Sequence, residues 1–326
     1  MTQYKYNLQL FAENTNVTTA SGLSEEMKTY YSDYLIDNAV PKLVHDQFGQ
    51  KHPIPKNGGK TIQFRKFNPL GKLTTPLQEG VSPDGQSLSV SVIEATVQQY
   101  GGYVTLSDML LLTAIDNNLV QATKLLGAQA GSTLDTIVRE VLNGGTNAIF
   151  AGGKNARGDL TSTDVLTVED VKKAVRLLKT QNAEQINGSW VGIIHPDVAY
   201  DLTNDPAWKD VKTYSDPSDL YEGEIGKIFG VRFVETTEAK IWAKAGSGSR
   251  AVYSTLILGD NAYGTTEIEG GGLEHIVKQL GSAGTADALN QRATAGWKAT
   301  KVAERLVENY MVRIESCSTF NPEVNN

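Results

Sequence analysis

A long amphipathic stretch over residues 118–142 is the feature that most constrains how this chain can fold. Its apolar side chains recur at steps of three or four residues, which is the spacing of one face of an α-helix. They are Leu119, Ala122, Leu126, Ala130, Leu134, Ile137 and Val141. At the helical rise per residue the stretch spans about 37 Å, which is long for a globular helix. We therefore expect a strut against which other elements pack.

Glycines mark the interior and the end of this predicted helix. Gly127 and Gly131 each cost up to about 1 kcal/mol relative to alanine inside a helix, so we expect another element to cross closely there. Gly144 and Gly145 follow the apolar stripe. Because glycine after a helix commonly takes the left-handed conformation that ends it, we expect a stop of that kind here.

Length, charge and cysteine content bound the class of protein. The 326 residues suffice for one large domain or two smaller ones, and no apolar run approaches the roughly 18 residues of a membrane helix. A net charge of −7 argues against a reader of nucleic-acid sequence, whose domains are usually basic, and leaves weak unspecific contact open. The sole cysteine, Cys317, and an N-terminus without a signal peptide fit a reducing cytoplasm.

The first 59 residues divide into two parts. Residues 1–23 carry few charges and too little apolar surface to fold alone, and we interpret them as an arm. Ser24 is placed to cap a helix that runs to about Ala39. A second piece over residues 42–48 precedes a run of Gly and Pro. We expect residues 25–59 to form a largely helical segment.

Between about Lys60 and Val97 the period of the pattern changes to two, which predicts half-buried strands. The expected inward positions are Ile62, Phe64, Lys66, Leu88, Val90 and Val92. A loop rich in Gly and Pro, residues 69–85, joins the two strands. An isolated hairpin is marginally stable in water, and so long a loop is uncommon unless it is functional. We expect this flap to lie on another chain.

The second half of the chain predicts an α+β module. After a Gly-rich surface connection over residues 147–163, Thr167 begins a helix with a capping box completed by Asp170. The other elements expected in it are a buried strand at 190–194, a helix from Pro196, a turn and strand at 224–235, and a central strand at 251–258. Two strand-like runs over residues 294–316 follow it.

Short motifs with possible chemistry are better explained as turns. Residues 57–61, Asn-Gly-Gly-Lys-Thr, look like the tail of a phosphate-binding loop, but Ile54 stands where that pattern needs glycine. We interpret them as a turn entering a strand. Residues 157–159, Arg-Gly-Asp, copy a cell-adhesion tripeptide, and we interpret them as an exposed turn.

No constellation of residues supports catalysis, a metal or a cofactor. The four histidines are scattered, without partners at metal-ligand spacing. Residues 246–249 are rich in Gly and Ser but lack the strand and helix that a nucleophilic serine needs. Cys317 is predicted to be a small buried hydrophobe. We therefore expect no catalytic, cofactor-binding or metal residues.

An arm, a flap, a strut and a module together indicate a protein that reaches its neighbours through heterologous contacts. With residues 7–12, Asn-Leu-Gln-Leu-Phe-Ala, residues 290–299, Asn-Gln-Arg-Ala-Thr-Ala-Gly-Trp-Lys-Ala, and residues 310–315, Tyr-Met-Val-Arg-Ile-Glu, the chain resembles the major capsid proteins of tailed double-stranded DNA phages. The C-terminal segments are the more specific and resemble the branch of N-four-like phages.

The resemblance implies the Hong Kong 97-type α+β fold and a division of the chain. Its parts would be an N-terminal arm (1–24), a helical segment (25–59), an extended loop (60–99), a peripheral domain (100–163 and 266–326) with a spine helix (118–142), and an axial domain (164–265). Hexamers and pentamers of an icosahedral shell around DNA would follow. We expect inter-subunit contacts through Leu10, Phe11, Lys72, Leu73, Leu77 and Glu79.

The resemblance also implies partners and a place. Only a short arm precedes the first predicted helix, so we expect a separate scaffolding protein, along with a portal and decoration proteins. Contact with packaged DNA would be weak, because the chain has a net negative charge and each fixed cation would add a salt-sensitive phosphate contact. Assembly would take place in the host cytoplasm and end in the virion. Some relatives join a loop lysine to a neighbour's asparagine; Lys72 lies on the loop, but no acceptor is marked.

Two other functions stay open at the level of sequence. One is the shell of a cellular nanocompartment with the same fold, which a cargo enzyme encoded beside it would indicate. The other is a soluble α+β enzyme or ligand-binding protein, which monomeric sedimentation and stabilisation by a ligand would indicate.

Overall fold

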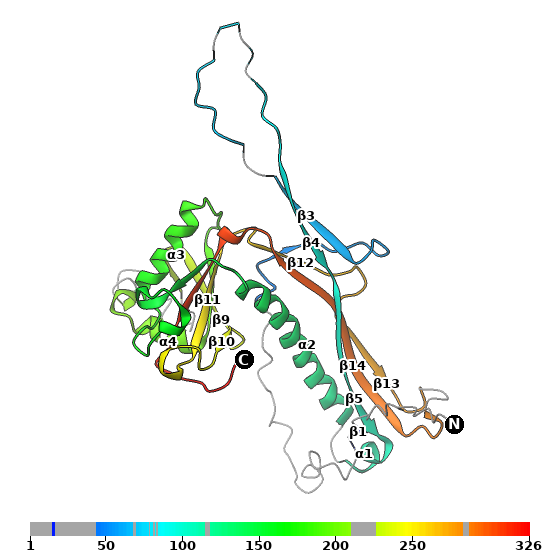
Figure 1. Ribbon diagram of the computed structural model, residues 1–326. Coiled ribbons are helices and arrows are strands. Elements are labelled where there is room, and N and C mark those ends of the chain that lie inside the picture. The colour runs from blue at the N-terminus through cyan, green and yellow to red at the C-terminus, as the bar shows by residue number, and fades with distance from the viewer. Residues whose placement is uncertain are drawn as a thin grey trace, which may run out of the picture. The chain divides into compact units, whose positions relative to one another are not determined.

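A computed structural model of the chain describes residues 15–16, 44–67, 70–77, 79–80, 82, 84–114, 118–209, 226–282 and 287–326. It divides into two compact units. The first comprises residues 1–40, 100–130 and 273–299, and the second comprises residues 41–99, 131–272 and 300–326. Helices and sheets occur together in it, which confirms the predicted α+β class (Figure 1). Among the described residues no helix is long and apolar enough to cross a membrane.

Helix α2 (Asn118–Asn143) confirms the predicted strut to within one residue. Its buried apolar side chains are Ala122, Leu126, Ala130, Leu134, Val138 and Leu142. The last two predicted positions, Ile137 and Val141, are wrong, because these side chains are only half-buried. Each step of four residues turns the buried line by about 40°, so it moves about 200° around the axis over the whole helix. The two halves of α2 accordingly belong to different units.

The prediction of a close crossing at Gly127 is wrong. This glycine is exposed, and a Cβ atom added to it would meet no atom within 4 Å. The buried line follows Leu126 and Ala130 instead.

Helix α2 ends where predicted but not by a left-handed glycine, since neither Gly144 nor Gly145 has a positive φ. Two arginines bind its last carbonyls instead. Arg305 Nη1 donates to Val141 O at 2.9 Å, and Arg313 Nη1 donates to Asn143 O at the end of the helix and, at 2.8 Å, to Gly145 O just beyond it. Such cations complement the negative end of the helix dipole.

The glycines leave room for these charged groups. A Cβ at Gly144 would lie 2.7 Å from Arg305 Nη1, and one at Gly145 would lie 2.7 Å from Glu308 Oε1. That Glu308 oxygen accepts from the backbone N–H of Thr146, just beyond the helix. Glycine is therefore needed here because charged side chains approach the backbone closely, and not because the backbone takes a left-handed conformation.

The first unit holds a small sheet and a short helix. Its described elements are β1 (Thr15–Asn16), β5 (Gln98–Ser107), α1 (Asp108–Thr113), β13 (Glu274–Lys278) and part of β14 (Arg292–Arg305). Ser107 caps α1 by accepting from Leu110 N at 3.2 Å.

Glycines allow β5 to lie very close to β14 around the buried Trp297. A Cβ at Gly101 would lie 2.7 Å from the Trp297 carbonyl oxygen, and a Cβ at Gly296 would lie 3.0 Å from the Gly102 carbonyl oxygen. The indole Nε1 of Trp297 donates to Gln129 Oε1 of α2 at 3.2 Å. Trp297 thus ties the sheet to the first half of the helix.

The largest sheet lies in the second unit. Its strands, in spatial order, are β6 (Ala148–Phe150), β15 (Met311–Ser316), β11 (Val252–Leu258), β7 (Trp190–Ile194), β9 (Val231–Glu235) and β8 (Lys227–Ile228), with β10 (Ile241–Trp242) also paired to β11. The predicted buried strand at 190–194 and central strand at 251–258 are confirmed. The prediction of a surface connection over 147–163 is wrong in part, because β6 pairs with β15 and Leu160 is fully buried.

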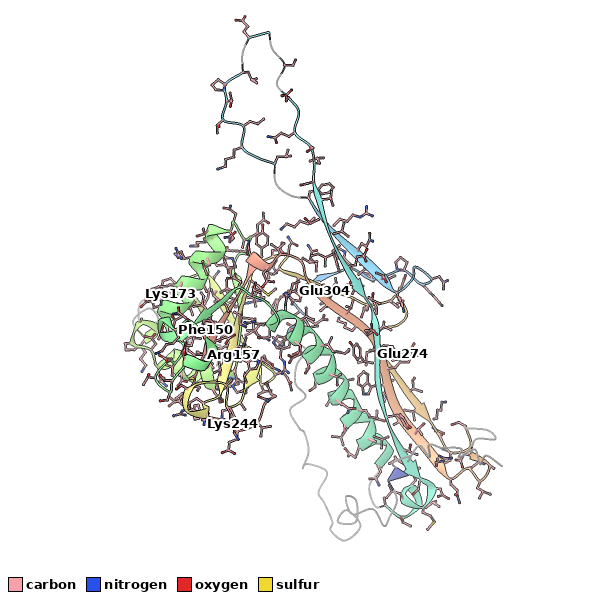
Figure 2. All side chains as sticks on the ribbon, viewed as in Figure 1. Phe150, Arg157, Lys173, Lys244, Glu274 and Glu304 are labelled. Carbon is pink, nitrogen blue, oxygen red and sulfur yellow. The ribbon has the colours of Figure 1, made fainter. Side chains whose placement is uncertain are left out.

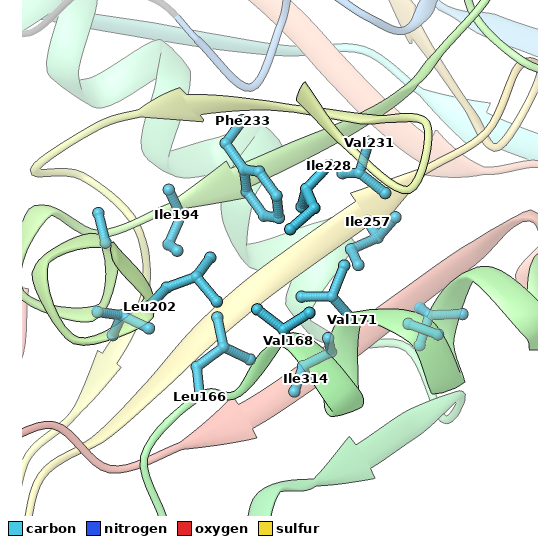
Figure 3. Close-up of a cluster of buried hydrophobic side chains, with 14 of the residues drawn as sticks. Leu166, Val168, Val171, Ile194, Leu202, Ile228, Val231, Phe233, Ile257 and Ile314 are labelled. Atoms are coloured by element: carbon cyan, nitrogen blue, oxygen red, sulfur yellow. The ribbon is translucent and has the colours of Figure 1, made fainter. Parts of the chain in front are cut away.

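Both faces of this sheet are covered. On one face, helices α3 (Val168–Thr180) and α4 (Pro196–Asn204) enclose the cluster shown in Figure 3, which includes Leu202 and Ile257. On the other face, Val138 and Leu142 of α2 pack on Leu256. Alternate residues of one strand thus serve two cores, which explains the continuous apolar pattern of β11.

The predicted helix starts in this region are confirmed. The Thr167 hydroxyl caps α3 by accepting from Asp170 N, and it donates to Asp170 Oδ2, so among the described bonds the pair is joined through the hydroxyl and not through the Thr167 backbone N–H of a full capping box. Pro196 is the first residue of α4. Short 3-10 turns occur at Ala151–Gly153, Arg157–Asp159, Ser247–Ser249 and Glu308–Tyr310.

A further group of strands in the second unit includes the predicted flap. Strand β12 (Tyr263–Thr266) pairs with β2 (Gln50–Lys51) and with the end of β14. Strands β3 (Thr61–Phe67) and β4 (Val90–Thr96) form an antiparallel hairpin, which continues into a long loop (Figure 1).

The predicted helical segment 25–59 is wrong where the structure describes it, because residues 44–49 form turns and bends. Tertiary contacts take the backbone groups that a helix would use. His45 N–H donates to Asp135 Oδ1 at 2.8 Å, and the Tyr263 hydroxyl donates to His45 O. The predicted helix at 24–39 lies outside the described residues.

Asp135 is a buried carboxylate at the middle of α2. Besides accepting from His45 N–H, its Oδ2 lies 2.6 Å from His45 Nδ1, and both side chains are 1% exposed. Replacing it leaves two buried polar groups without partners.

We expect Asp135→Ala to lower the free energy of unfolding by about 3 kcal/mol, since breaking a buried polar pair strands its partner. Asp135→Asn, which keeps an oxygen for the His45 N–H, should lose clearly less. Urea unfolding followed by tryptophan fluorescence measures both. Equal stability of Asp135→Ala and the unchanged protein would contradict this role.

Candidate assembly surface

Large apolar side chains, of the kind that is usually buried, are exposed on the hairpin β3–β4 and its loop. Leu73 and Leu77 are 76% and 74% exposed, and Phe67 at the end of β3 is 66% exposed. The others in this stretch are Leu70, Leu88, Val90 and Val92. A monomeric protein rarely exposes so many along one segment, and such patches mark interaction sites.

The hairpin has one face on its own unit and one face in solvent. Cross-strand pairs place Phe64 opposite Ile93 and Ile62 opposite Ala95, and these are the half-buried or buried side chains. Phe64 reaches Gly264 of β12, where a Cβ would lie 3.0 Å from its ring. The base of the hairpin is therefore anchored.

The opposite face is exposed along its whole length. Phe67 pairs with Val90 and Arg65 pairs with Val92, and all four are exposed. The prediction that Leu88, Val90 and Val92 point inward is wrong within this chain, and Lys66 is exposed as well. The alternation marks a second face, apolar at its loop end through Phe67, Val90 and Val92, rather than the face that packs on the body.

Four of the predicted contact residues lie on the loop: Lys72, Leu73, Leu77 and Glu79. All are exposed. The described residues between β3 and β4 form no strand, and a hydrogen bond between them joins Gln86 Nε2 to Gly71 O at 3.1 Å. The other two, Leu10 and Phe11, lie outside the described residues. The sequence did not identify the exposed side chains of Phe67 and Val92 as contact residues, although the period-two pattern of both strands was visible.

The first unit exposes a second apolar surface on β13 and the residues after it. Every residue of β13 is exposed, and Glu274, labelled in Figure 2, pairs with Lys298 of β14 at 3.0 Å. The exposed apolar side chains here are Leu273, Ile276, Val277, Leu280 and Leu289. A strand with an exposed edge and apolar side chains is suited to pairing with another chain.

Polar groups that could do chemistry are used in packing. Among the described residues no group of three or more His, Cys, Asp or Glu side chains is placed to hold a metal. Burial lowers the pKa of His195 against the opposing effect of Asp197, and its neutral Nδ1 accepts from Asp197 N at the start of α4. Burial and a hydrogen bond to Asp197 raise the pKa of Tyr253.

Cys317 is the small buried side chain that was predicted, fully buried beside Leu160 and Val252. Burial, together with Asp164, raises the pKa of its thiol to about 11, so the reactive thiolate is scarce at neutral pH.

The turn interpretation is confirmed for residues 57–61 but not for the whole of residues 157–159. Asn57 and Gly59 take positive φ in a turn before β3, which confirms the interpretation as a turn. The prediction of an exposed turn at 157–159 is wrong for Arg157, which binds the fully buried Glu315 through Nε and Nη2 at 2.7 and 2.8 Å. Its guanidinium also lies 3.6 Å from the centre of the Trp242 ring. The long sequence separation left no signal for this pair.

Comparison with known proteins gives one kind of match. Residues 112–279, just over half of the chain, match the model of a family described as phage capsid protein. The capsid of Ralstonia phage GP4 superposes with a TM-score of 0.70 and 14% identity over 90% of this chain and 96% of that one. The capsid of cyanophage Pam1 gives 0.71 and 14% over 95% and 100%.

The head of Helicobacter pylori bacteriophage KHP40 is also similar, with a TM-score of 0.60 and 12% identity over 94% of this chain and 98% of that one. No curated protein sequence matches the chain.

The exposed loop should contribute little to the stability of the single chain. We expect the double change Leu73→Ser and Leu77→Ser to alter the free energy of unfolding by less than about 0.5 kcal/mol, because neither side chain loses buried contacts. Leu256→Ser, the same change in a buried strand, should cost at least about 2 kcal/mol. Urea unfolding of the monomer distinguishes them, and a comparable loss in both would show that the loop leucines are already buried.

Proposed function

This chain belongs to the phage capsid protein family and has the Hong Kong 97-type fold, and from that premise we propose that its copies close into hexamers and pentamers of an icosahedral head around double-stranded DNA. It is a structural protein of the capsid lattice. The observation that carries the proposal is the hairpin β3–β4 with its loop, where one set of large apolar side chains stays exposed in the described part of the structure.

The physical basis is burial completed by association. Exposed apolar area is worth about 25 cal/mol per Å² once it is removed from water. Ordering a loop costs about 1–2 kcal/mol per residue, so the loop gains stability only by docking on another copy. The anchored base of the hairpin, with Phe64 against Gly264, reduces the number of residues left to order.

We propose the division of the chain that the family resemblance implies. Residues 1–24 act as an arm and residues 25–59 lead from it to the extended loop at 60–99. Residues 100–163 and 266–326 form the peripheral domain and residues 164–265 the axial domain around the symmetry axes. Contacts between copies include Leu10, Phe11, Lys72, Leu73, Leu77 and Glu79.

Other partners follow from the same proposal. A portal and decoration proteins would complete a head that is assembled in the host cytoplasm, and contact with packaged DNA would be weak. We assign no enzymatic role, cofactor or metal to the chain. The same chain must form both hexamers and pentamers, so another factor has to set the curvature of the shell. This supports a separate scaffolding protein.

The loop leucines test the assembly proposal. We expect the unchanged protein to form particles much larger than a monomer in sedimentation velocity and electron microscopy. Leu73→Ser with Leu77→Ser should reduce the assembled fraction at least tenfold, because the docking area becomes polar. Val324→Ser, at a side chain 75% exposed elsewhere, should assemble normally. A monomeric unchanged protein, or normal assembly of the double variant, would count against the proposal.

The scaffolding partner has its own test. Expressed alone, the protein should give particles of mixed size and shape, and co-expression with a scaffolding protein from the same phage genome should give shells of one size. Electron microscopy of both preparations measures the size distribution. Uniform shells from this chain alone would refute the need for a second protein.

A further inference from the structure

Helix α3 carries an open basic hollow that the loop contacts leave unused. The hollow has a volume of about 630 Å³ and is lined by Lys172, Val175, Arg176, Lys179, Thr180 and Phe229. Its cations are exposed and recur at steps of four and three residues, so they follow one face of the helix. A protein with a net charge of −7 thus concentrates positive charge at one place.

In the described part of the structure, Lys172, Arg176 and Lys179 form no ion pair with a carboxylate. Lys173 contrasts with them, since its Nζ lies 3.2 Å from Asp170 and 3.4 Å from Glu169 (Figure 2 labels Lys173). The two acidic side chains of α3, Glu169 and Asp170, therefore pair with Lys173 and not with the cations of the hollow.

An aromatic ring is held in the hollow against a conformational cost. Phe229 and Gly230 form the two-residue turn between β8 and β9, and both have positive φ, at 48° and 83°. Turns of this kind favour Asn-Gly, because a bulky side chain is strained at positive φ. Phe229 is nevertheless 41% exposed, with Lys172 Nζ 4.6 Å from its ring centre. The strained backbone of Phe229 places an aromatic ring at the surface, and such strain is typical of residues that contact a binding partner.

Cations around an exposed aromatic ring fit an acidic peptide with aromatic or apolar anchors. The phosphates of a DNA duplex would satisfy the cations but offer no group to cover the ring, because its bases are stacked inside. The chain itself contains a segment of the required kind at residues 210–225, which lies outside the described residues. It holds five carboxylates and one lysine, with Tyr214, Leu220 and Tyr221 among them.

We propose that the basic hollow of α3 binds the acidic segment 210–225 of a neighbouring copy. The inference rests on the proposed assembly and adds a contact to it. Two different and complementary surfaces on one chain make a heterologous contact, the kind that closes copies into a ring. Since its charges are exposed, the contact is screened by salt and weakens as ionic strength rises.

Charge reversal tests the contact. The hollow variant carries K172E, R176E and K179E, and the segment variant carries D216K, D219K and E222K. Each alone brings like charges together, and we expect at least a tenfold loss of rings in native mass spectrometry and electron microscopy. An equimolar mixture should restore six-membered rings, because alternating copies place opposite charges at every contact. A ring of five cannot alternate throughout and should stay depleted.

Controls separate this inference from its alternatives. K56E with K124E and K244E makes the same change in charge at exposed lysines outside both the hollow and the extended loop, and should assemble normally. Circular dichroism and the urea midpoint confirm that each variant is folded. Failure of the mixture to form rings would place the contact within one chain or nowhere, and would overturn the proposal.

Loss of binding to duplex DNA in the hollow variant, with normal rings in both variants, would assign the hollow to nucleic acid and overturn the proposal as well. Absence of particles from the unchanged protein would instead count against the proposed function.

Discussion

The rest of the structure depends on how helix α2 is buried. Its apolar side chains follow steps of four residues from Ala122 to Leu142, and because a helix has 3.6 residues per turn, the buried line winds around it. One half is buried with Trp297 and the strands of the first unit, and the other half covers a face of the large sheet in the second. A straight stripe could serve only one core.

Charged groups secure the end of that helix and the strands near it. Arg305 and Arg313 bind carbonyl groups at the C-terminus of α2. Arg313 and Arg157 both bind Glu315, which is fully buried in β15. A buried carboxylate is costly without partners, and here it has two. The turn at Arg157, strand β15 and the helix end are thereby held in one arrangement.

Stability and assembly are divided between different surfaces. The sheet around β11 is covered on both faces and is complete within the chain. The hairpin β3–β4 is anchored by Phe64 but exposes Phe67 and Val92 on its other face. A subunit of this kind folds by burying one set of apolar side chains and associates by burying another. The capsid family to which it belongs needs both properties.

The sequence by itself determined the elements whose signals are local. The cap at Thr167, the proline at the start of α4 and the bounds of α2 need only neighbours along the chain, and all three were predicted correctly, α2 to within one residue. The tertiary structure decided the rest. It drew His45 to Asp135 and Arg157 to Glu315, and turned Val90 and Val92 toward solvent. Periodicity shows that a strand has an apolar face, but only the packed chain shows which surface covers that face, because the partners are distant in sequence or belong to another copy.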